Sequence, residues 1–127
     1  MSWQVYVDQS LLSTGKVSKA AIHGHDGNLW ATSTGFSVTN AEVLKLVEAY
    51  KDPSGIQAGG LHLAGTKYTF LRTFENEIYG KKGSDQGCCI VKTPKAIIIG
   101  VYEAGMQGGE ANKVVGALGD YLKQNGY

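Results

Sequence analysis

The stretch Ala96-Ile97-Ile98-Ile99-Gly100-Val101 is apolar at nearly every position. Successive side chains of a strand point to opposite faces of a sheet, so a strand of this composition must be covered on both faces. The stretch is also far shorter than the roughly 20 apolar residues that a membrane-spanning helix needs. It therefore predicts a buried strand, 95–103, placed centrally in a sheet that has helices on both sides.

The chain before this strand has an apolar period of two from Gly59 onward, with turn residues about every ten positions. Loops this short permit only antiparallel neighbours. Near the N-terminus, Asp26-Gly27 predicts a hairpin, because glycine adopts positive φ without steric cost. The expected strands are 17–24, 28–33, 60–64, 67–74, 77–82, 88–93 and 95–103.

Helices are expected in three places around this sheet. Thr39 and Glu42 have the spacing of a capping box, which predicts a helix over 42–51 that Asp52-Pro53 stops. The first dozen residues, with Ser2 as the candidate N-cap, and the last dozen also have helical apolar patterns.

Two glycines, Gly116 and Gly119, each cost the last helix about 1 kcal/mol relative to alanine. We therefore expect the N-terminal helix to approach it closely there. The sequence predicts one α+β domain over residues 1–127. In it, a central antiparallel sheet of about six to seven strands has the N- and C-terminal helices on one face and a smaller helix or helices on the other.

Composition narrows the class of protein further. The chain has 127 residues and a formal net charge of +1, which does not indicate nucleic acid as the main partner. The two cysteines, Cys88 and Cys89, are adjacent, so a bond between them would be strained and reduced thiols are expected. With no signal peptide at the N-terminus, we expect a cytoplasmic protein.

Signals for catalysis are weak. The sequence has no nucleophile elbow, phosphate-binding loop, dinucleotide fingerprint or H-E-x-x-H pair. His23, His25 and His62 could form a metal site only if the fold brought them together. Cys88 could act as a nucleophile only beside a histidine, and a buried structural thiol is favoured.

The aromatic residues are more informative. Trp3, Tyr6, Trp30, Tyr121 and Tyr127 combine flat apolar surfaces with an N–H or O–H donor, the combination that clamps polyproline II helices. Core packing is the alternative, but residues at the chain ends seldom reach a core. If the terminal helices lie side by side, these aromatic side chains come within reach of one another.

Basic residues form a second set on three successive strands and a turn. They are Arg72, Lys81, Lys82, Lys92 and Lys95. Strand alternation divides the set between two faces, although Arg72, Lys81 and Lys92 could cluster near one edge. A solvated face, an acidic protein partner and an anionic lipid headgroup all remain open.

Four separated motifs in this sequence resemble the profilin family, and its amoeboid, fungal and plant type more than the animal type. They are Ser2-Trp3-Gln4-x-Tyr6-Val7-Asp8, Ala20-Ala21-Ile22 with Asp26-Gly27-x-x-Trp30-Ala31, Ile78-Tyr79-Gly80-Lys81-Lys82-Gly83, and Gly119-Asp120-Tyr121-Leu122. The resemblance covers essentially the whole chain. It implies an actin-monomer-binding protein with no enzymatic activity and no cofactor, located in the cytoplasm, the cytoskeleton and the cell cortex.

The resemblance also implies sites. Proline-rich segments of formin-like proteins would bind Trp3, Tyr6, Trp30, Tyr121 and Tyr127. Actin would contact Arg72, Lys81, Lys92, Gly109, Asn112 and Lys113. Phosphoinositides would bind Arg72, Lys81, Lys82, Lys92 and Lys95. Many relatives have Pro-Gly where this chain has Gly108-Gly109, so the actin contact there departs from the family pattern.

The function so implied is to cover one end of an actin monomer, which suppresses nucleation while permitting addition at barbed ends, and to promote nucleotide exchange on actin. Two alternatives come from other classes. One is a small ligand-sensing or enzyme domain, which would need a pocket beneath the sheet. The other is a phosphoinositide-binding adaptor without actin affinity.

Overall fold

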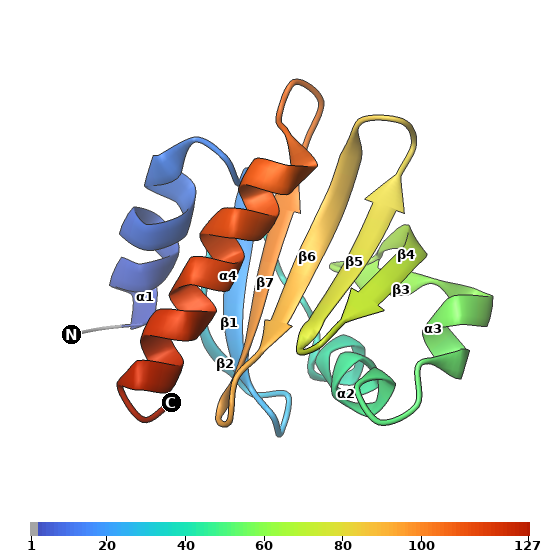
Figure 1. The fold of residues 1–127 in the computed structure, drawn as a ribbon, viewed down its shortest axis with the longest axis horizontal. Helices are drawn as coiled ribbons and strands as arrows, with labels where there is room; N and C mark the ends of the chain where they lie inside the picture. Colours follow the sequence, from blue (N-terminus) through green and yellow to red (C-terminus); the bar gives the residue numbers. More distant parts are fainter. Residues whose placement is uncertain (1–2) are drawn as a thin grey trace.

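The computed structural model describes residues 3–127, and the proposed N-cap Ser2 lies outside them. Seven strands form one antiparallel sheet with the order β2-β1-β7-β6-β5-β4-β3 (Figure 1). The strands are β1 Lys19–Gly24, β2 Leu29–Thr32, β3 Leu61–Leu63, β4 Thr66–Phe74, β5 Glu77–Lys82, β6 Gln86–Lys92 and β7 Ala96–Tyr102. The predicted sheet is therefore confirmed, and the strand bounds differ from the expected ones by no more than about two residues.

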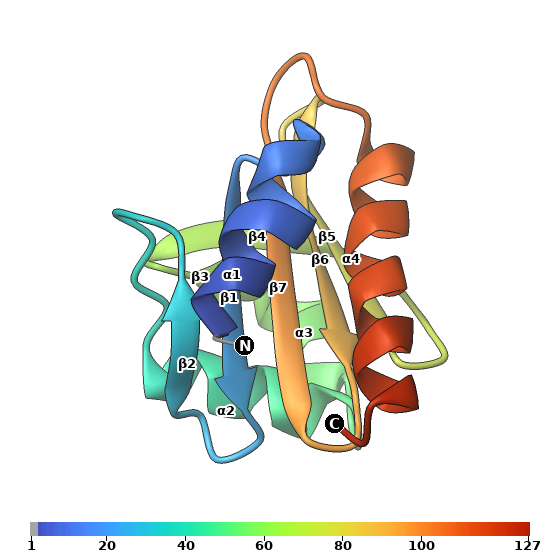
Figure 2. The same ribbon diagram turned by 90° about the vertical axis from the view of Figure 1, so that its left-hand side faces the viewer.

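Helices cover both faces of the sheet (Figure 2). One face carries α2, Asn40–Ala49, and the short α3, Ser54–Gly59. The other carries α4, Gly108–Gln124, and an N-terminal helical segment made of α1 Trp3–Val5, η1 Tyr6–Leu11 and η2 Leu12–Thr14. The two terminal helices thus share a face, as the sequence predicts.

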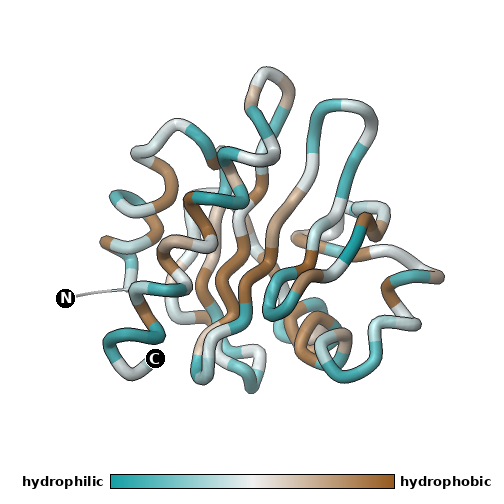
Figure 3. Tube along the Cα trace, in the orientation of Figure 1, coloured by the Kyte–Doolittle hydropathy of each residue, from teal (hydrophilic) through white to brown (hydrophobic). Residues whose placement is uncertain are grey.

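Strand β7 is the interior strand that the sequence predicts. Ile97 and Ile99 lie in the apolar core beneath α2, while Ile98 lies in the core beneath α4. All three side chains are fully buried, and the hydrophobic colouring of Figure 3 is concentrated along the middle strands. Burial on both faces explains the unbroken apolar run.

The sequence-based prediction allows for a second small helix on this face, but it does not locate helix α3. Its six residues include two glycines, which lower helix propensity, so no apolar period reveals it. It forms because Ile56 is buried in the core beneath α2, and because the Asp52 carboxylate accepts the N–H of Ser54 at 3.1 Å. No helix within residues 3–127 is long and apolar enough to cross a membrane.

The predicted capping box is confirmed and extended by a tertiary contact. The Thr39 hydroxyl accepts the N–H of Glu42 at 3.2 Å, and the Glu42 carboxylate accepts the N–H of Thr39 at 2.9 Å. The same carboxylate also accepts the backbone N–H groups of Ala64 and Gly65, each at 3.0 Å. Glu42 therefore ties the start of α2 to the β3–β4 turn.

The predicted reason for the glycines of α4 is wrong. A Cβ at Gly119 would lie 2.7 Å from Val91 Cγ1 of β6, so this glycine permits close packing on the sheet and not on the N-terminal helix. A Cβ at Gly116 would meet nothing within 4 Å. Tight packing therefore explains only one of the two glycines.

This difference predicts opposite effects for the same substitution. Gly116→Ala should raise the free energy of unfolding by about 1 kcal/mol, because alanine favours the helix and enters open space. Gly119→Ala should lower it by about 1 to 2 kcal/mol, because the stiff, buried Val91 side chain cannot move aside freely. Urea unfolding monitored by circular dichroism measures both, and equal effects would contradict the packing difference.

His23 lies on β1 and its side chain is fully buried. Its Nδ1 lies 3.1 Å from the carbonyl oxygen of Gly27, and its Nε2 has no hydrogen-bond partner in the described part of the chain. Burial lowers the pKa of His23, and the bond to Gly27 only partly opposes this. The ring is therefore neutral, with Nδ1 as the donor.

A lowered pKa in the folded state makes stability depend on pH in a known direction. As the pH falls below the ordinary histidine value of 6.5, the unfolded chain takes up a proton that the folded chain does not, so the free energy of unfolding falls. We expect His23→Leu to flatten this dependence between pH 6.5 and 5. Urea unfolding at several pH values tests it, and an unchanged slope would assign the effect to other groups.

Candidate functional site

An aromatic cluster lies where the N-terminal helical segment meets the end of α4. Its members are Trp3, Tyr6, Trp30, Tyr121 and Tyr127. Trp3 lies at the centre of the cluster. The centroid of its ring lies 4.6 Å from the ring centroid of Trp30, 4.9 Å from that of Tyr127 and 5.5 Å from that of Tyr6. Tyr6 lies 6.0 Å from Tyr121. The structure thus brings together all five residues that the sequence singled out.

The cluster is accessible at the surface. Tyr121 and Tyr127 are 44% and 41% exposed, and Trp3, Tyr6 and Trp30 are only half-buried. Burial, and then the neighbouring Tyr121, raise the pKa of Tyr6, so its phenol stays protonated. The cluster therefore places aromatic side chains at the surface of the molecule.

Two neighbouring segments hold the cluster in place. The carbonyl oxygen of Tyr127 accepts the N–H of Lys95 and the hydroxyl of Thr93, each at 2.7 Å, so the β6–β7 turn anchors this residue. Lys95 Nζ also lies 5.8 Å from the centre of the Tyr127 ring. On the other side, the Gln4 amide donates to the Thr32 carbonyl at 2.9 Å and ties the first helix to β2.

A second feature, the seam hollow, continues from this cluster along the line where the two terminal helices meet. It has a volume of about 500 Å³. It is lined by Val5, Tyr6, Gln9, Ser10, Thr14, Val114, Ala117, Leu118 and Tyr121. Sequence analysis did not predict most of these positions, although Tyr6, Ser10 and Thr14 recur every four residues on one helix face.

A third feature, the sheet-side hollow, lies on the other side of α4, between this helix and strands β4 and β5. It has a volume of about 470 Å³ and is lined by Arg72, Glu77, Tyr79, Gly109, Asn112, Lys113, Gly116, Ala117 and Asp120. The Arg72 guanidinium lies 5.1 Å above the Tyr79 ring. The Asn112 side-chain oxygen is buried without a hydrogen-bond partner in residues 3–127. Four of the six residues expected to contact actin therefore line one hollow.

The expected cluster of Arg72, Lys81 and Lys92 does not form. Arg72 and Lys81 share the sheet face that carries α4, because Lys81 is two residues from Tyr79 on β5. Lys92 points to the opposite face, where its Nζ lies 5.6 Å from the Tyr50 ring of the segment after α2. Strand register decides this separation.

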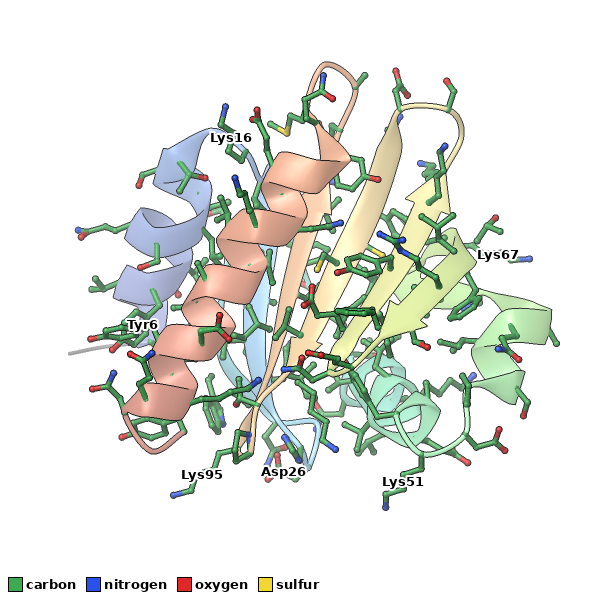
Figure 4. The ribbon with its side chains drawn as sticks, viewed as in Figure 1. Tyr6, Lys16, Asp26, Lys51, Lys67 and Lys95 are labelled. Atoms are coloured by element: carbon green, nitrogen blue, oxygen red, sulfur yellow. The ribbon has the colours of Figure 1, made fainter. Side chains whose placement is uncertain are left out.

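The other two basic residues, Lys82 and Lys95, also lie apart from Arg72 and Lys81. Lys82 is exposed on the α2 side of β5, by the same alternation, and Lys95 belongs to the β6–β7 turn beside Tyr127. Figure 4 shows Lys95 at the end of the molecule near the chain's C-terminus. The five basic residues therefore do not make one continuous patch.

The histidines do not come together either. His23 is buried on β1, while His62 is exposed on β3 at the far edge of the sheet. His25 Nε2 instead lies 2.7 Å from the carbonyl oxygen of Thr93. Among residues 3–127, no group of three metal-ligating side chains is placed to hold an ion.

The cysteines behave as structural residues. Cys88 lies in the core beneath α2 and Cys89 in the core beneath α4, as strand alternation predicts, and both are free thiols. Burial raises the pKa of the Cys88 thiol to about 12. A thiol with so high a pKa is a poor nucleophile at neutral pH.

An antiparallel sheet between two helical layers, with aromatic residues partly exposed where the terminal helices meet, defines a small α+β protein with an aromatic surface cluster. The chain belongs to the profilin family, whose family model matches residues 1–127. Members of this family are actin-binding regulators and not enzymes.

Individual relatives agree with this assignment. The chain is 52% identical to Profilin-2 of Acanthamoeba castellanii over 127 residues, which is all of both chains. It superposes on the crystal structure of profilin II from the same organism with a TM-score of 0.95, over 99% of this chain and 100% of that one. The match to an amoeboid profilin confirms the resemblance seen in the sequence motifs.

A third relative was solved with a ligand. Mouse profilin IIa, in complex with a double repeat from the FH1 domain of mDia1, is 25% identical to this chain. The two superpose with a TM-score of 0.85 over the whole of both chains.

Proposed function

We propose that this protein binds actin monomers and proline-rich segments on two sides of α4, and that it regulates actin polymerisation by holding both. The observation that carries the proposal is the placement of the two sites. The aromatic cluster lies on the side of α4 that faces the N-terminal helix, and the sheet-side hollow lies on the side that faces β4 and β5.

The aromatic cluster suits a proline-rich segment on chemical grounds. A polyproline II helix is already extended, so binding it forfeits little conformational entropy. Its carbonyl groups are unpaired and can accept from the indole N–H of Trp3 and the phenol O–H of Tyr6, while pyrrolidine rings pack on the ring faces. The mouse relative bound to an FH1 repeat supports the same class of ligand, the proline-rich segments of formin-like proteins.

The actin-binding surface proposed here is the sheet-side hollow with its surroundings. Arg72, Gly109, Asn112 and Lys113 line it, and Lys81 lies on the same sheet face. Arg72 and Lys113 provide positive charge for an acidic surface. Lys92 lies on the opposite face of the sheet, so it would contact actin only if actin extended around the edge of the sheet.

Binding at this surface would cover one end of an actin monomer. That would suppress spontaneous nucleation, permit addition at barbed ends and promote nucleotide exchange on actin. A proline-rich segment bound at the aromatic cluster would raise the effective concentration of the actin complex near the protein that carries the segment. These roles place the protein in the cytoplasm and at the cell cortex.

We extend the proposal to a third ligand, phosphoinositides. Arg72 and Lys81 share one face and would give an anionic headgroup two cations, whereas Lys82, Lys92 and Lys95 lie elsewhere. Because Arg72 also belongs to the actin surface, the two ligands should compete. Displacement of actin by vesicles that contain phosphoinositide tests this.

The main test reverses charge at one position. Arg72→Glu should weaken binding of monomeric actin at least tenfold, because it places a carboxylate in the proposed contact, and should leave binding of an oligoproline peptide unchanged. The matched control is Lys67→Glu, a charge reversal of the same sign on the same strand. Lys67 projects from the β3–β4 side of the molecule, away from Tyr6 (Figure 4).

Actin binding is measured by fluorescence of labelled monomer and oligoproline binding by calorimetry. Loss of both ligands in Arg72→Glu would contradict two independent surfaces. Equal actin affinity in Arg72→Glu and Lys67→Glu would place the actin contact elsewhere.

A further inference from the structure

His25 has no role in the function proposed above. It lies in the β1–β2 turn, and its imidazole Nε2 lies 2.7 Å from the carbonyl oxygen of Thr93 in the β6–β7 turn, 68 positions later in the chain. A carbonyl oxygen only accepts, so Nε2 carries the proton and donates it. Figure 4 shows Asp26 and Lys95, one from each turn, at the same end of the molecule. His25 therefore bridges the two turns.

Thr93 depends on this bond because it is buried. It is only 1% exposed. Its N–H donates to the Ala96 carbonyl at 2.9 Å, and its hydroxyl accepts the N–H of Ala96 at 2.9 Å and donates to the carbonyl oxygen of Tyr127 at 2.7 Å. A buried carbonyl that lacks a donor is costly, and His25 supplies the donor for the carbonyl of Thr93.

On the other side of the bridge, the β1–β2 turn packs against Trp30. A Cβ at Gly24 would lie 3.1 Å from Trp30 Nε1, so the indole lies directly on the end of β1. The turn is braced by backbone bonds from the Gly24 N–H to the Asn28 carbonyl at 2.9 Å and from the Gly27 N–H to the Gly24 carbonyl at 3.1 Å. Short contacts therefore fix Trp30 relative to the turn that carries His25.

These contacts form a closed chain around Trp3. The ring centroid of Trp3 lies 4.6 Å from that of Trp30 and 4.9 Å from that of Tyr127. Trp30 packs on the turn that carries His25, and Tyr127 is held by the turn that carries Thr93. The backbone ladder between β1 and β7 ends where these turns begin, so the His25 side chain continues the connection beyond the sheet.

We infer that His25 is a positioning residue for proline-rich ligands, because it holds Trp30 and Tyr127 at the spacing that lets one ligand contact both rings with Trp3 between them. His25 is half-buried with its Nε2 turned to Thr93, and it needs no contact with the ligand. A surface already held in its binding geometry loses less conformational entropy when the ligand binds. This inference rests on the proposed binding of proline-rich segments and adds the group that fixes the geometry of the site.

The test compares two replacements of this side chain by titration calorimetry with a capped oligoproline peptide. His25→Leu removes the donor and should weaken binding about tenfold, because the two rings lose their fixed spacing. His25→Gln places an amide N–H near the position of Nε2 and should restore the affinity to within about twofold of wild type. The control is His62→Leu, at an exposed position of β3 on the opposite edge of the sheet from β2, which should leave the affinity unchanged.

A spectroscopic readout separates positioning from a general loss of stability. In NMR spectra of the free protein, His25→Leu should shift the indole N–H of Trp30 and the ring resonances of Tyr127. His25→Gln should return both toward their wild-type positions. Urea unfolding is measured on the same samples, because a loss of stability alone would leave these resonances of the folded state in place.

The outcomes separate the two proposals. If wild type binds oligoproline and His25→Leu binds it equally well, His25 does not position the site, while the proposed function stands. Equal weakening in His25→Leu and His25→Gln, with the resonances of Trp30 and Tyr127 unmoved, would overturn the bridge as the cause. If wild type binds no oligoproline, the proposed function fails and this inference with it.

Discussion

Replacing Trp3 with alanine should lower the affinity for an oligoproline peptide by about a hundredfold. Trp3 contacts three other rings of the aromatic cluster, with centroid distances from 4.6 to 5.5 Å. A central aromatic residue of a binding surface commonly contributes about 2 to 4 kcal/mol, and 2.8 kcal/mol corresponds to a factor of about one hundred. Titration calorimetry measures the change.

The fold should survive this substitution. Trp3 is half-buried and lies at the margin of the core beneath α4, which is built mainly from fully buried residues of the strands and of α4. Leu44→Ala is the matched control, because Leu44 is a 46% exposed apolar residue of α2, on the opposite face of the sheet. A similar loss of affinity in both variants would indicate a general effect on the fold, and no loss in Trp3→Ala would remove the aromatic cluster as the binding site.

The second large effect is expected at Glu42. Its carboxylate accepts three backbone N–H groups, from Thr39, Ala64 and Gly65, at 2.9 to 3.0 Å. Hydrogen bonds to a charged group contribute about 1.5 to 3 kcal/mol each and are not additive when they share one acceptor. Glu42→Ala should therefore lower the free energy of unfolding by about 3 kcal/mol, whereas Glu48→Ala, at an exposed position of the same helix, should change it by less than about 0.5 kcal/mol.

The contribution of Glu42 should also depend on pH. Burial alone would raise the pKa of this carboxyl, but the backbone N–H groups of Gly65, Thr39 and Ala64 outweigh burial and lower the pKa below its ordinary value of 4.5. A carboxyl with a lowered folded-state pKa contributes stability above the unfolded value and loses it as the pH falls through the folded value. The difference between wild type and Glu42→Ala should thus be full at pH 7 and shrink below about pH 4.5.

Guanidinium unfolding at pH 7, 5 and 3 measures this difference. If it stays constant down to pH 3, the charge of Glu42 does not carry the stabilisation. Glu42→Gln separates the effect of side-chain shape from that of charge, because the amide keeps one acceptor oxygen in a similar position. At pH 7 this variant should regain part of the free energy of unfolding that Glu42→Ala loses.

The aromatic cluster could be predicted because local sequence patterns at the two chain ends identify most of its members. Trp3 and Tyr6 lie on a helical stripe at one end of the chain, and Tyr121 lies on another at the opposite end. Large aromatic residues so near the termini have few partners other than each other. Their contact in the structure follows from two amphipathic helices that must cover the same sheet face.

The basic residues could not be placed in the same way. The alternation of each strand is visible in the sequence, but the face that a residue occupies depends on how the strands pair. The register that pairs Tyr79 with Cys89 and Arg72 with Tyr79 puts Arg72 and Lys81 on the α4 face and leaves Lys92 on the other. A slip of one residue would have exchanged the faces.

The sequence by itself determined the antiparallel sheet, the buried run of β7, the capping box of α2 and the helical apolar pattern of each chain end. Each depends on a period or a spacing within about ten neighbouring residues, where backbone geometry fixes which side chains share a face. Only the tertiary structure decided the hydrogen bonds from the β3–β4 turn to Glu42, the close packing of Gly119 on Val91, and the two hollows beside α4. These features join segments that are distant in the chain, and their geometry follows from register and packing, which no local pattern encodes.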